Sequence, residues 1–261
     1  MKTSDPKTVV LTKRKFLSRT LTALGGLVLA GCDRLSMTPK FMSLLRSGSE
    51  LSYKAHRAII GDSLAQEFSE SDLSPTFRGN GTTNPRSAHY QALVQSQFAD
   101  WFLEIDGLVE QPLKLSLQDL KALPSRTQIT RHDCVEGWSA IGKWKGVQLT
   151  QLLALAKPKP NAQFVVFRCA DPMMADGSNP YYESIDMHDA HHPQTILAYE
   201  LNDKTLPVTN GAPIRLRVER QLGYKQAKYI MRIELVESFA DIEGGNGGFW
   251  EDRGYAWYGG I

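Results

Sequence analysis

The segment RHDCVEGWSAIGKW, residues 131–144, places a cysteine among charged and aromatic residues in the middle of a 261-residue chain. The chain has only two other cysteines, Cys32 and Cys169. A thiol in such surroundings has two ordinary uses, as half of a disulfide or as a thiolate ligand of a metal. Which use is open to Cys134 depends on the compartment in which the chain folds, and the first residues of the chain bear on that.

Residues 1–31 have the pattern of an export signal. Three consecutive basic residues, Lys13, Arg14 and Lys15, precede a largely apolar stretch, residues 21–31, that is too short to span a bilayer as a mature helix. The hexapeptide TKRKFL resembles the twin-arginine export motif, with Lys13 in place of the first arginine. The general secretory route would accept the same segment.

The end of this signal resembles a bacterial lipobox. The tetrapeptide LAGC, residues 29–32, places Cys32 where the lipid-modified first residue of a mature lipoprotein stands, and Asp33 resembles the inner-membrane retention signal. We therefore expect a periplasmic domain that is anchored by lipid to the inner membrane. In that oxidising compartment, pairing of Cys134 with Cys169 would be the ordinary outcome.

The charge balance gives no reason to expect nucleic acid as a partner. The chain has 30 Lys and Arg and 28 Asp and Glu, and removal of residues 1–31, with six basic residues and one acidic residue, leaves 24 against 27. Nucleic-acid binding relies on an excess of basic side chains that neutralise phosphates. The mature chain has a net charge near −3 and therefore has no such excess.

The rest of the chain is expected to have three parts. Residues 32–88 are polar and rich in Ser, Gly and Asn, and predict an extended arm that wraps the domain. Residues 89–240 contain the elements of the main domain. Residues 241–261 form a tail of glycine and aromatic residues, which we expect to pack as a terminal loop and not to bind a ligand.

Residue periodicity indicates short strands and few helices. Ser116 is a plausible cap for a short helix that ends near Leu123, and residues 148–156 read as a second helix. No regular alternation of strand and helix is present, so the fold class is predicted to be mixed α+β, mostly β. Strands are expected at 101–105, 126–131, 163–169, 195–202, 213–219 and 228–237.

Six segments of the main domain follow one another in an order that is specific only when they are taken together. They are WFLEIDGLV (101–109), CVEGW (134–138), WKGVQL (144–149), LAYELN (197–202), NGAPIR (210–215) and GYKQAK (223–228). Together they resemble the molybdopterin-binding domain of the sulfite oxidase superfamily. The resemblance runs over roughly residues 76–240, and its CVEGW segment is closest to the branch with the periplasmic methionine-sulfoxide reductase catalytic subunit. It implies a compact mixed α+β domain that holds the molybdenum–molybdopterin cofactor.

This resemblance implies that Cys134 ligates molybdenum through its sulfur. A soft thiolate suits a metal that changes oxidation state, and it must lose its proton to bind. We expect the adjoining Arg131 and His132 to lower the pKa of the Cys134 thiol. The remaining ligands would be the dithiolene of the pterin and oxo or hydroxo groups, and the cofactor would carry the oxygen-atom and electron transfer.

The resemblance also implies residues that bind the pterin and its phosphate, which needs cations and N–H donors. Lys225 is a further candidate cation, and Arg78 a further candidate of the N-terminal loop. From its pattern alone, Arg215 would be a solvated arginine on an alternating strand. The implied cofactor-binding residues are Asn80, Cys134, Asn210, Arg215, Gln226, Ala227 and Lys228.

Two single residues and one cluster of histidines can each be interpreted in two ways. Glu136 is a candidate catalytic residue, because oxygen-atom transfer needs a proton relay, although a surface glutamate is an equal alternative. Cys169 is either a buried structural thiol or a wall of the cofactor pocket. The cluster of His188, His191 and His192 has helical spacing that would suit zinc, but exposed histidines are the expectation that we favour.

Two functions from different classes remain. The first is an oxygen-atom-transfer oxidoreductase that acts on a sulfoxide or a sulfite-like compound. Because we recognise neither a haem segment nor a dimerisation domain, we expect a monomer whose electron partner is a membrane b-type cytochrome or a soluble cytochrome. The second is a non-catalytic lipoprotein that uses the same domain for binding and contains a Cys134–Cys169 disulfide.

Overall fold

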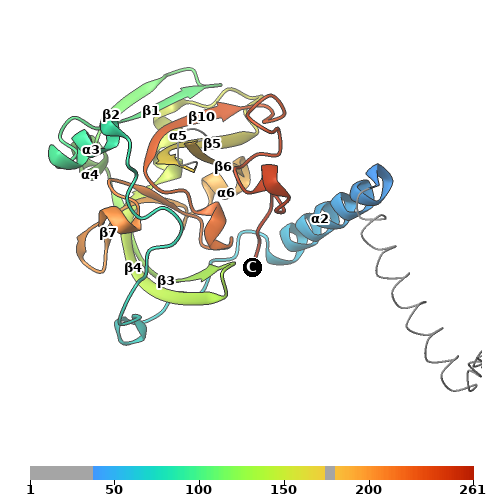
Figure 1. Ribbon diagram of the computed structural model, residues 1–261, viewed down its shortest axis with the longest axis horizontal. Coiled ribbons are helices and arrows are strands. Elements are labelled where there is room, and N and C mark those ends of the chain that lie inside the picture. Colours follow the sequence, from blue (N-terminus) through green and yellow to red (C-terminus); the bar gives the residue numbers. More distant parts are fainter. Residues whose placement is uncertain (1–37, 174–179) are drawn as a thin grey trace, which may run out of the picture. The chain divides into compact units, whose positions relative to one another are not determined.

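The structure is a computed structural model that describes residues 38–173 and 180–261 (Figure 1). The expected export signal, the lipobox with Cys32, and Asp33 lie outside the described residues. The chain divides into two compact units, residues 1–58 and residues 59–261. The strands among the described residues all belong to the second unit.

A long helix corrects the prediction of an extended arm over residues 32–88. Helix α2, Pro39–Ile60, has 22 residues. Pro39 begins it, where a missing N–H costs nothing, and Gly61 follows it with a positive φ of 54°, as is common after a helix. No helix among the described residues combines the length and the apolar character that crossing a bilayer requires.

One sheet contains the strands that open and close the main domain. Its order is β2-β1-β10-β5-β6, in which β1 and β10 are parallel and the other neighbours are antiparallel. The strands are β1 (Phe102–Gly107), β2 (Leu113–Ser116), β5 (Phe164–Pro172), β6 (Pro180–Asp186) and β10 (Ile230–Val236).

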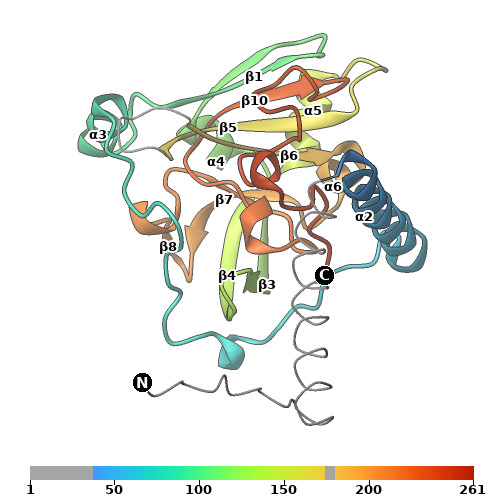
Figure 2. The same cartoon turned by 45° about the vertical axis from the view of Figure 1, so that its right-hand side comes forward.

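The second sheet carries the opening segment of the sequence. Its order is β3-β4-β7-β8, and β9 pairs with β7. Figure 2 shows β3 and β4 side by side and apart from β1, β10 and β5. The strands are β3 (Ser125–Cys134), β4 (Trp138–Gln148), β7 (Ile196–Leu201), β8 (Lys204–Thr205) and β9 (Arg215–Arg217).

The helices of the second unit are short, which confirms the mixed α+β class with mostly strands. Ser116 caps α4 as predicted: its side chain accepts a hydrogen bond from Asp119 N, and the Asp119 carboxylate accepts one from Ser116 N. The helices are α3 (Ala88–Gln95), α4 (Leu117–Ala122), α5 (Leu149–Ala156) and α6 (Met187–His191), with 3-10 turns η1 (Glu70–Asp72), η2 (Val208–Asn210), η3 (Gly223–Lys225) and η4 (Glu251–Arg253).

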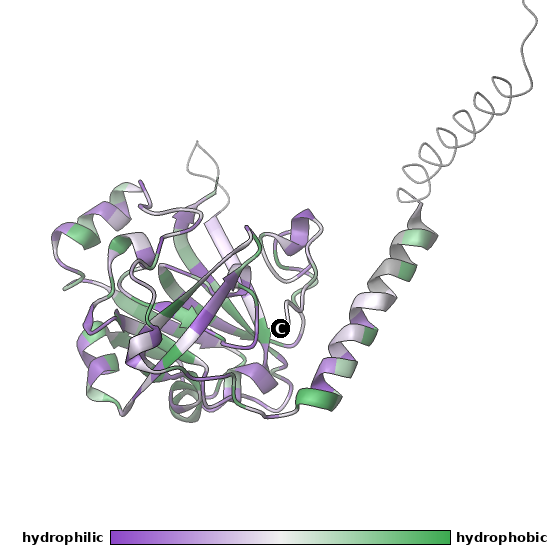
Figure 3. Cartoon of the chain, turned by 90° about the horizontal axis from the view of Figure 1, so that it is seen from below, coloured by the Kyte–Doolittle hydropathy of each residue, from purple (hydrophilic) through white to green (hydrophobic). Residues whose placement is uncertain are grey.

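Two kinds of buried strand face coexist in this unit. Strand β1 alternates in the usual way, with Leu103 and Ile105 buried in the apolar core, and Figure 3 shows the hydrophobic segments on such strands. Strand β3 instead buries polar side chains, among them Thr130 and His132, and ends with buried Cys134. Buried polar groups require partners, so this face belongs to a site and not to an apolar core.

The contact between β4 and β7 leaves no room for a side chain at Gly146. A Cβ at this position would collide with Leu197 O and lie 2.6 Å from Ala198 Cα. We predict that Gly146→Ala destabilises the strand-rich unit by about 1–3 kcal/mol, since overpacking forces the backbone to shift. Urea unfolding followed by tryptophan fluorescence measures the change.

Gly48→Ala is the matched control, because Gly48 lies in α2 and a Cβ there has no atom within 4 Å. This substitution should leave the unfolding of the strand-rich unit unchanged. Equal stability of wild type and Gly146→Ala would contradict the close approach of β4 and β7.

Candidate functional site

A tight hairpin holds Cys134 at its tip. Strands β3 and β4 pair in continuous register up to the last pair, Cys134 with Trp138. The loop between them has three residues, and Gly137, with φ of 83°, closes it by donating its N–H to Cys134 O at 3.0 Å. The Cys134 side chain therefore lies at the end of the buried face of β3, 8% exposed.

Cys134 lines a pocket of about 160 Å³. The walls come from segments that are far apart in the sequence, from the Asn80–Thr82 loop to the C-terminal tail. Five residues proposed from the sequence meet there, namely Asn80, Cys134, Glu136, Gln226 and Lys228. Their convergence is the feature from which the site is built.

Lys228 and Asn80 form one support of the thiol. The Asn80 Nδ2 lies 3.9 Å from Cys134 Sγ, at which it points as a donor. The Lys228 ammonium donates to Asn80 O at 2.6 Å and also to Thr82 O. Lys228 thus holds the Asn80–Thr82 loop against the cysteine, and burial together with the Arg215 charge lowers the pKa of Lys228 to about 8.

Glu136 lies at the mouth of the pocket. Its carboxylate accepts a hydrogen bond from Trp138 Nε1 at 3.0 Å and is 3.7 Å from the Arg78 guanidinium. The guanidinium in turn lies 4.9 Å from the Trp138 ring. The Glu136 side chain is 49% exposed, so it reaches both the pocket and solvent, which is what a proton relay requires.

Arg215 is not a solvated surface residue. It is 1% exposed, and its guanidinium donates to Asn210 O at 3.0 Å and to Gln226 O at 3.4 Å. Burial and the neighbouring Arg217 charge lower the pKa of Arg215 to about 9. In the described part of the chain it has no ion pair, and its buried Nε has no partner.

This arrangement fits a phosphate-bearing cofactor. An uncompensated buried guanidinium is stabilised by an anion with several acceptor oxygens. The backbone at Gly211 lies against the side chains of Lys228 and Arg215. A Cβ added at Gly211 would lie 2.9 Å from Lys228 Cβ and 3.3 Å from Arg215 Cβ. Cys134, Asn80, Gln226 and Lys228 line the pocket, whereas Asn210 and Arg215 are buried and are not among its lining residues, although Arg215 donates to the carbonyls of Asn210 and Gln226.

Arg217 stabilises the strand that carries the cysteine. Its guanidinium donates hydrogen bonds to both carboxylate oxygens of Glu219, and the distance from Nε to Oε1 is 2.9 Å. It also donates to His132 Nδ1 at 2.9 Å. It also lies 4.5 Å from the Trp144 ring. Both Arg217 and Glu219 have completely buried side chains.

The expectation that Arg131 and His132 lower the pKa of Cys134 is wrong in this structure. Arg131 is exposed and donates to Asp133 at 2.9 Å. Burial and the Arg217 charge hold the pKa of His132 well below its ordinary value, so the ring is neutral. Burial, chiefly, raises the pKa of the Cys134 thiol, with Arg78 among the groups that oppose the rise.

Lys225 does not reach this site as a free cation. Its ammonium is completely buried between Glu183 and Glu251, with the Glu251 contact at 2.6 Å. The Ala227 side chain lies in the apolar core, and its carbonyl accepts from Leu216 N at 2.8 Å. Only the backbone of Ala227 is therefore available to a cofactor.

Both described cysteines are free thiols, which contradicts the alternative with a Cys134–Cys169 disulfide. Cys169 belongs to the apolar core, and it is not among the residues that line the pocket. Burial raises its pKa well above the ordinary value. Cys169 is accordingly a structural thiol in this fold.

The C-terminal tail contributes to the pocket, contrary to the prediction of a plain terminal loop. Trp250 and Tyr255 line it together with Tyr224 and Tyr181. The Trp250 and Tyr255 rings are 5.4 Å apart and tilted by 31°, and the Tyr224 and Tyr255 rings are 5.3 Å apart. Asp171 and Met173 also line the pocket and were not expected from the sequence.

The histidine cluster gives no metal centre within the described residues. His188 lies 3.4 Å from an Asp62 oxygen, and His191 Nδ1 is 3.2 Å from the Thr150 hydroxyl. The expectation of exposed histidines is wrong for His192, which is 5% exposed and contacts Ser63 O at 3.3 Å.

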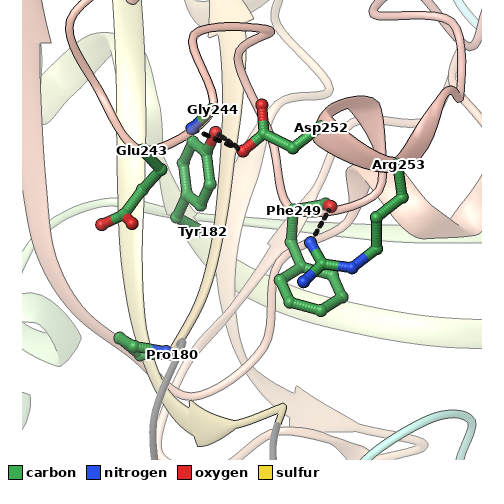
Figure 4. Close-up of a pocket in the computed structure, with 7 residues that line it drawn as sticks. All are labelled: Pro180, Tyr182, Glu243, Gly244, Phe249, Asp252 and Arg253. Atoms are coloured by element: carbon green, nitrogen blue, oxygen red, sulfur yellow. Dashed lines mark hydrogen bonds between the residues drawn. The ribbon is translucent and has the colours of Figure 1, made fainter.

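A larger cavity of about 410 Å³ lies elsewhere on the domain (Figure 4). Its polar groups satisfy one another: Asp252 accepts from Gly244 N at 3.0 Å, and Arg253 donates to Phe249 O at 2.8 Å. None of its lining residues is a thiol. The smaller pocket around Cys134 is therefore the candidate site.

A mixed α+β domain with a thiol and a buried cation at one pocket has the features of a cofactor-binding domain. Comparison with known families agrees, because the oxidoreductase molybdopterin binding domain matches residues 89–241. The chain belongs to this family and is a molybdopterin-dependent oxidoreductase that uses the molybdenum cofactor.

Three relatives illustrate the similarity. The chain is 38% identical over 256 residues (95% of this chain, 87% of the relative) to a putative protein-methionine-sulfoxide reductase subunit YedZ1 of Azospira oryzae. It is 37% identical over 147 residues (53% and 50%) to the protein-methionine-sulfoxide reductase catalytic subunit MsrP of Campylobacter jejuni. It is 36% identical over 171 residues (62% and 52%) to MsrP of Xanthomonas axonopodis.

The matches to the two MsrP proteins cover about half the length of each. Among solved structures, the chain is similar to the sulfane dehydrogenase SoxCD from Paracoccus pantotrophus, with a TM-score of 0.49 and 25% identity over 53% of this chain and 39% of that chain.

The Arg217–Glu219 pair offers a test of how the site is supported. We predict that Arg217→Met destabilises the domain by about 3–5 kcal/mol, because it leaves the Glu219 carboxylate buried and unpaired. Urea unfolding measures this loss. The double variant Arg217→Met/Glu219→Gln should recover a large part of it, and a single variant as stable as wild type would show that the pair is not buried.

Proposed function

We propose that the chain is the catalytic subunit of a methionine-sulfoxide reductase, which removes the oxygen of methionine sulfoxide with electrons from the reduced molybdenum cofactor. The charge of the pocket is the observation that carries this proposal. The names of the YedZ1 and MsrP relatives support it.

The pocket suits a neutral substrate better than an anion. Of the described residues that line it, Lys228 is the one basic side chain, and its ammonium is already bound to the carbonyls of Asn80 and Thr82. Two carboxyl groups, those of Glu136 and Asp171, line the same pocket. The Glu136 carboxylate, at the mouth of the pocket, repels sulfite, whereas a sulfoxide carries no net charge.

The walls of the pocket suit the side chain of methionine. Tyr181, Tyr224, Trp250 and Tyr255 present aromatic rings, and Met173 adds a thioether. Sulfur makes favourable contacts with aromatic rings, and these walls would bind the methyl and methylene groups on either side of the sulfoxide.

Each residue of the site has a separate task in this proposal. Cys134 binds the metal, and the Asn80 amide orients the cysteine sulfur by hydrogen bonding. Arg215, with Asn210, Gln226 and the Ala227 backbone, would hold the anionic tail of the cofactor, and Lys228 would hold the Asn80–Thr82 loop against the cysteine. The bound cofactor supplies the electron pair, and Glu136 passes protons between solvent and the pocket.

We extend the proposal to the setting of the enzyme. The signal-like residues 1–31 and the lipobox support a monomeric, lipid-anchored protein at the periplasmic face of the inner membrane. A membrane b-type cytochrome or a soluble cytochrome would then supply the electrons. Lipid analysis of Cys32 and fractionation of the expressing cells test the anchor.

Cys134→Ser tests the cofactor assignment. We expect the full-length wild type, expressed in a molybdenum-replete bacterium, to contain near-stoichiometric molybdenum and to reduce peptide methionine sulfoxide with reduced benzyl viologen. The variant should lose most of its molybdenum and its activity, because serine lacks the thiol that deprotonates to the anionic sulfur ligand. Mass spectrometry gives the metal content.

Cys169→Ala is the matched control, because Cys169 is buried in the apolar core, where a small apolar side chain is tolerated. It should keep both molybdenum and activity. Loaded wild type that oxidises sulfite but does not reduce methionine sulfoxide would overturn the proposed substrate, and equal molybdenum in Cys134→Ser and wild type would overturn the role of Cys134.

A further inference from the structure

Asp171 is a buried carboxylic acid in the pocket. It stands near the end of β5 and is 3% exposed, yet it lines the same pocket as Cys134. One of its oxygens, Oδ1, is buried and has no hydrogen-bond partner. A buried carboxylate without a partner is costly, so a neutral carboxylic acid that can donate a proton fits this position better.

The surroundings of Asp171 favour the neutral acid only moderately. Burial raises its pKa to about 7, and the Lys228 ammonium and the Thr82 hydroxyl act in the opposite direction. Within the described residues, the other titratable groups that act on Asp171 are Cys169 of β5, Tyr181 of β6, Tyr90 of α3 and Tyr229, all with raised pKa values and hence neutral near pH 7.

We propose that Asp171 is a catalytic acid that donates a proton to the sulfoxide oxygen as the S–O bond breaks. This inference rests on the proposed function. The electron pair that leaves the sulfur as a thioether would come from the bound, reduced molybdenum cofactor. The oxygen leaves as water with one proton from Asp171 and a second from solvent, and Asp171 then regains its proton from solvent.

This role gives the reaction a defined pH dependence. The folded-state pKa of Asp171 lies above the ordinary value of 3.8, so the donor is present below about pH 7 and is lost as the pH rises through that value. The Lys228 pKa of about 8 keeps its ammonium charged over most of this range. The rate should therefore fall on the alkaline side of pH 7.

The test uses the full-length, molybdenum-loaded enzyme with Asp171→Asn. With methionine sulfoxide and reduced benzyl viologen, kcat should fall about 100-fold while KM stays unchanged, since a positioned acid typically contributes 10²–10⁴-fold. The residual rate should no longer fall as the pH rises through about 7. Asp171→Glu, which keeps an acid, should restore part of the rate.

Infrared spectroscopy gives a readout that does not depend on turnover. In a pH titration, wild type should show a carboxylic-acid C=O band that disappears near pH 7, and Asp171→Asn should lack it. Asp106→Asn is the matched control, because Asp106 pairs with Arg232 outside the pocket. Its rate, pH profile and infrared band should be those of wild type.

The outcomes separate the two proposals. Loaded wild type without activity on methionine sulfoxide overturns the proposed function and the catalytic role of Asp171 with it. Active wild type, together with an Asp171→Asn variant of the same rate and pH profile, overturns the role of Asp171 alone. Loss of molybdenum from Asp171→Asn, or an unchanged infrared titration, also overturns it, because the residue would then be structural or permanently ionised.

Discussion

The paired ladder of the β3–β4 hairpin is the constraint on which the site depends. It runs in unbroken register from Ser125 and Val147 to Cys134 and Trp138, so the position of the thiol is fixed by the whole ladder. Near its base, Gly146 lets β4 approach β7 so closely that no side chain fits between them. At its tip, Gly137 turns the chain without moving Cys134 off the buried face. Backbone hydrogen bonds of the ladder fix the main chain of Cys134, and the Asn80 amide contacts its sulfur.

Buried charged side chains surround this hairpin and the pocket at its tip. Arg217 is neutralised by Glu219, whereas Arg215 has no ion pair in the described part of the chain, and its buried Nε has no hydrogen-bond partner. On the other side, the completely buried Lys225 ties the tail through Glu251 to β6 through Glu183. That cluster lies close in sequence to Trp250 and Tyr255, the tail residues that form the aromatic wall. The hairpin and the aromatic wall are thus supported by separate sets of buried charges.

Local patterns predicted much of this fold, but not the contacts between distant segments. The strands at 126–131, 163–169 and 228–237, the α5 helix and the Ser116 cap follow from periodicity and capping, which act over a few residues. Helix α2 was missed because the four serines and the one glycine in its sequence suggested an irregular arm. Lys225 pairs with two glutamates, and Trp250 lines the same pocket as Cys134. Both features depend on tertiary folding, and no local sequence pattern predicts them. The neutral His132 was missed for the same reason, since its burial against Arg217 is a tertiary effect.

The most direct measurement of the central claim is molybdenum K-edge X-ray absorption on the loaded Cys169→Ala protein. In this variant Cys134 is the only thiol of the sequence after Cys32. The account predicts one more sulfur neighbour of the metal than the dithiolene of the pterin supplies. A metal whose only sulfur neighbours are those of the dithiolene would contradict the assignment of Cys134 as the ligand that joins the cofactor to the fold.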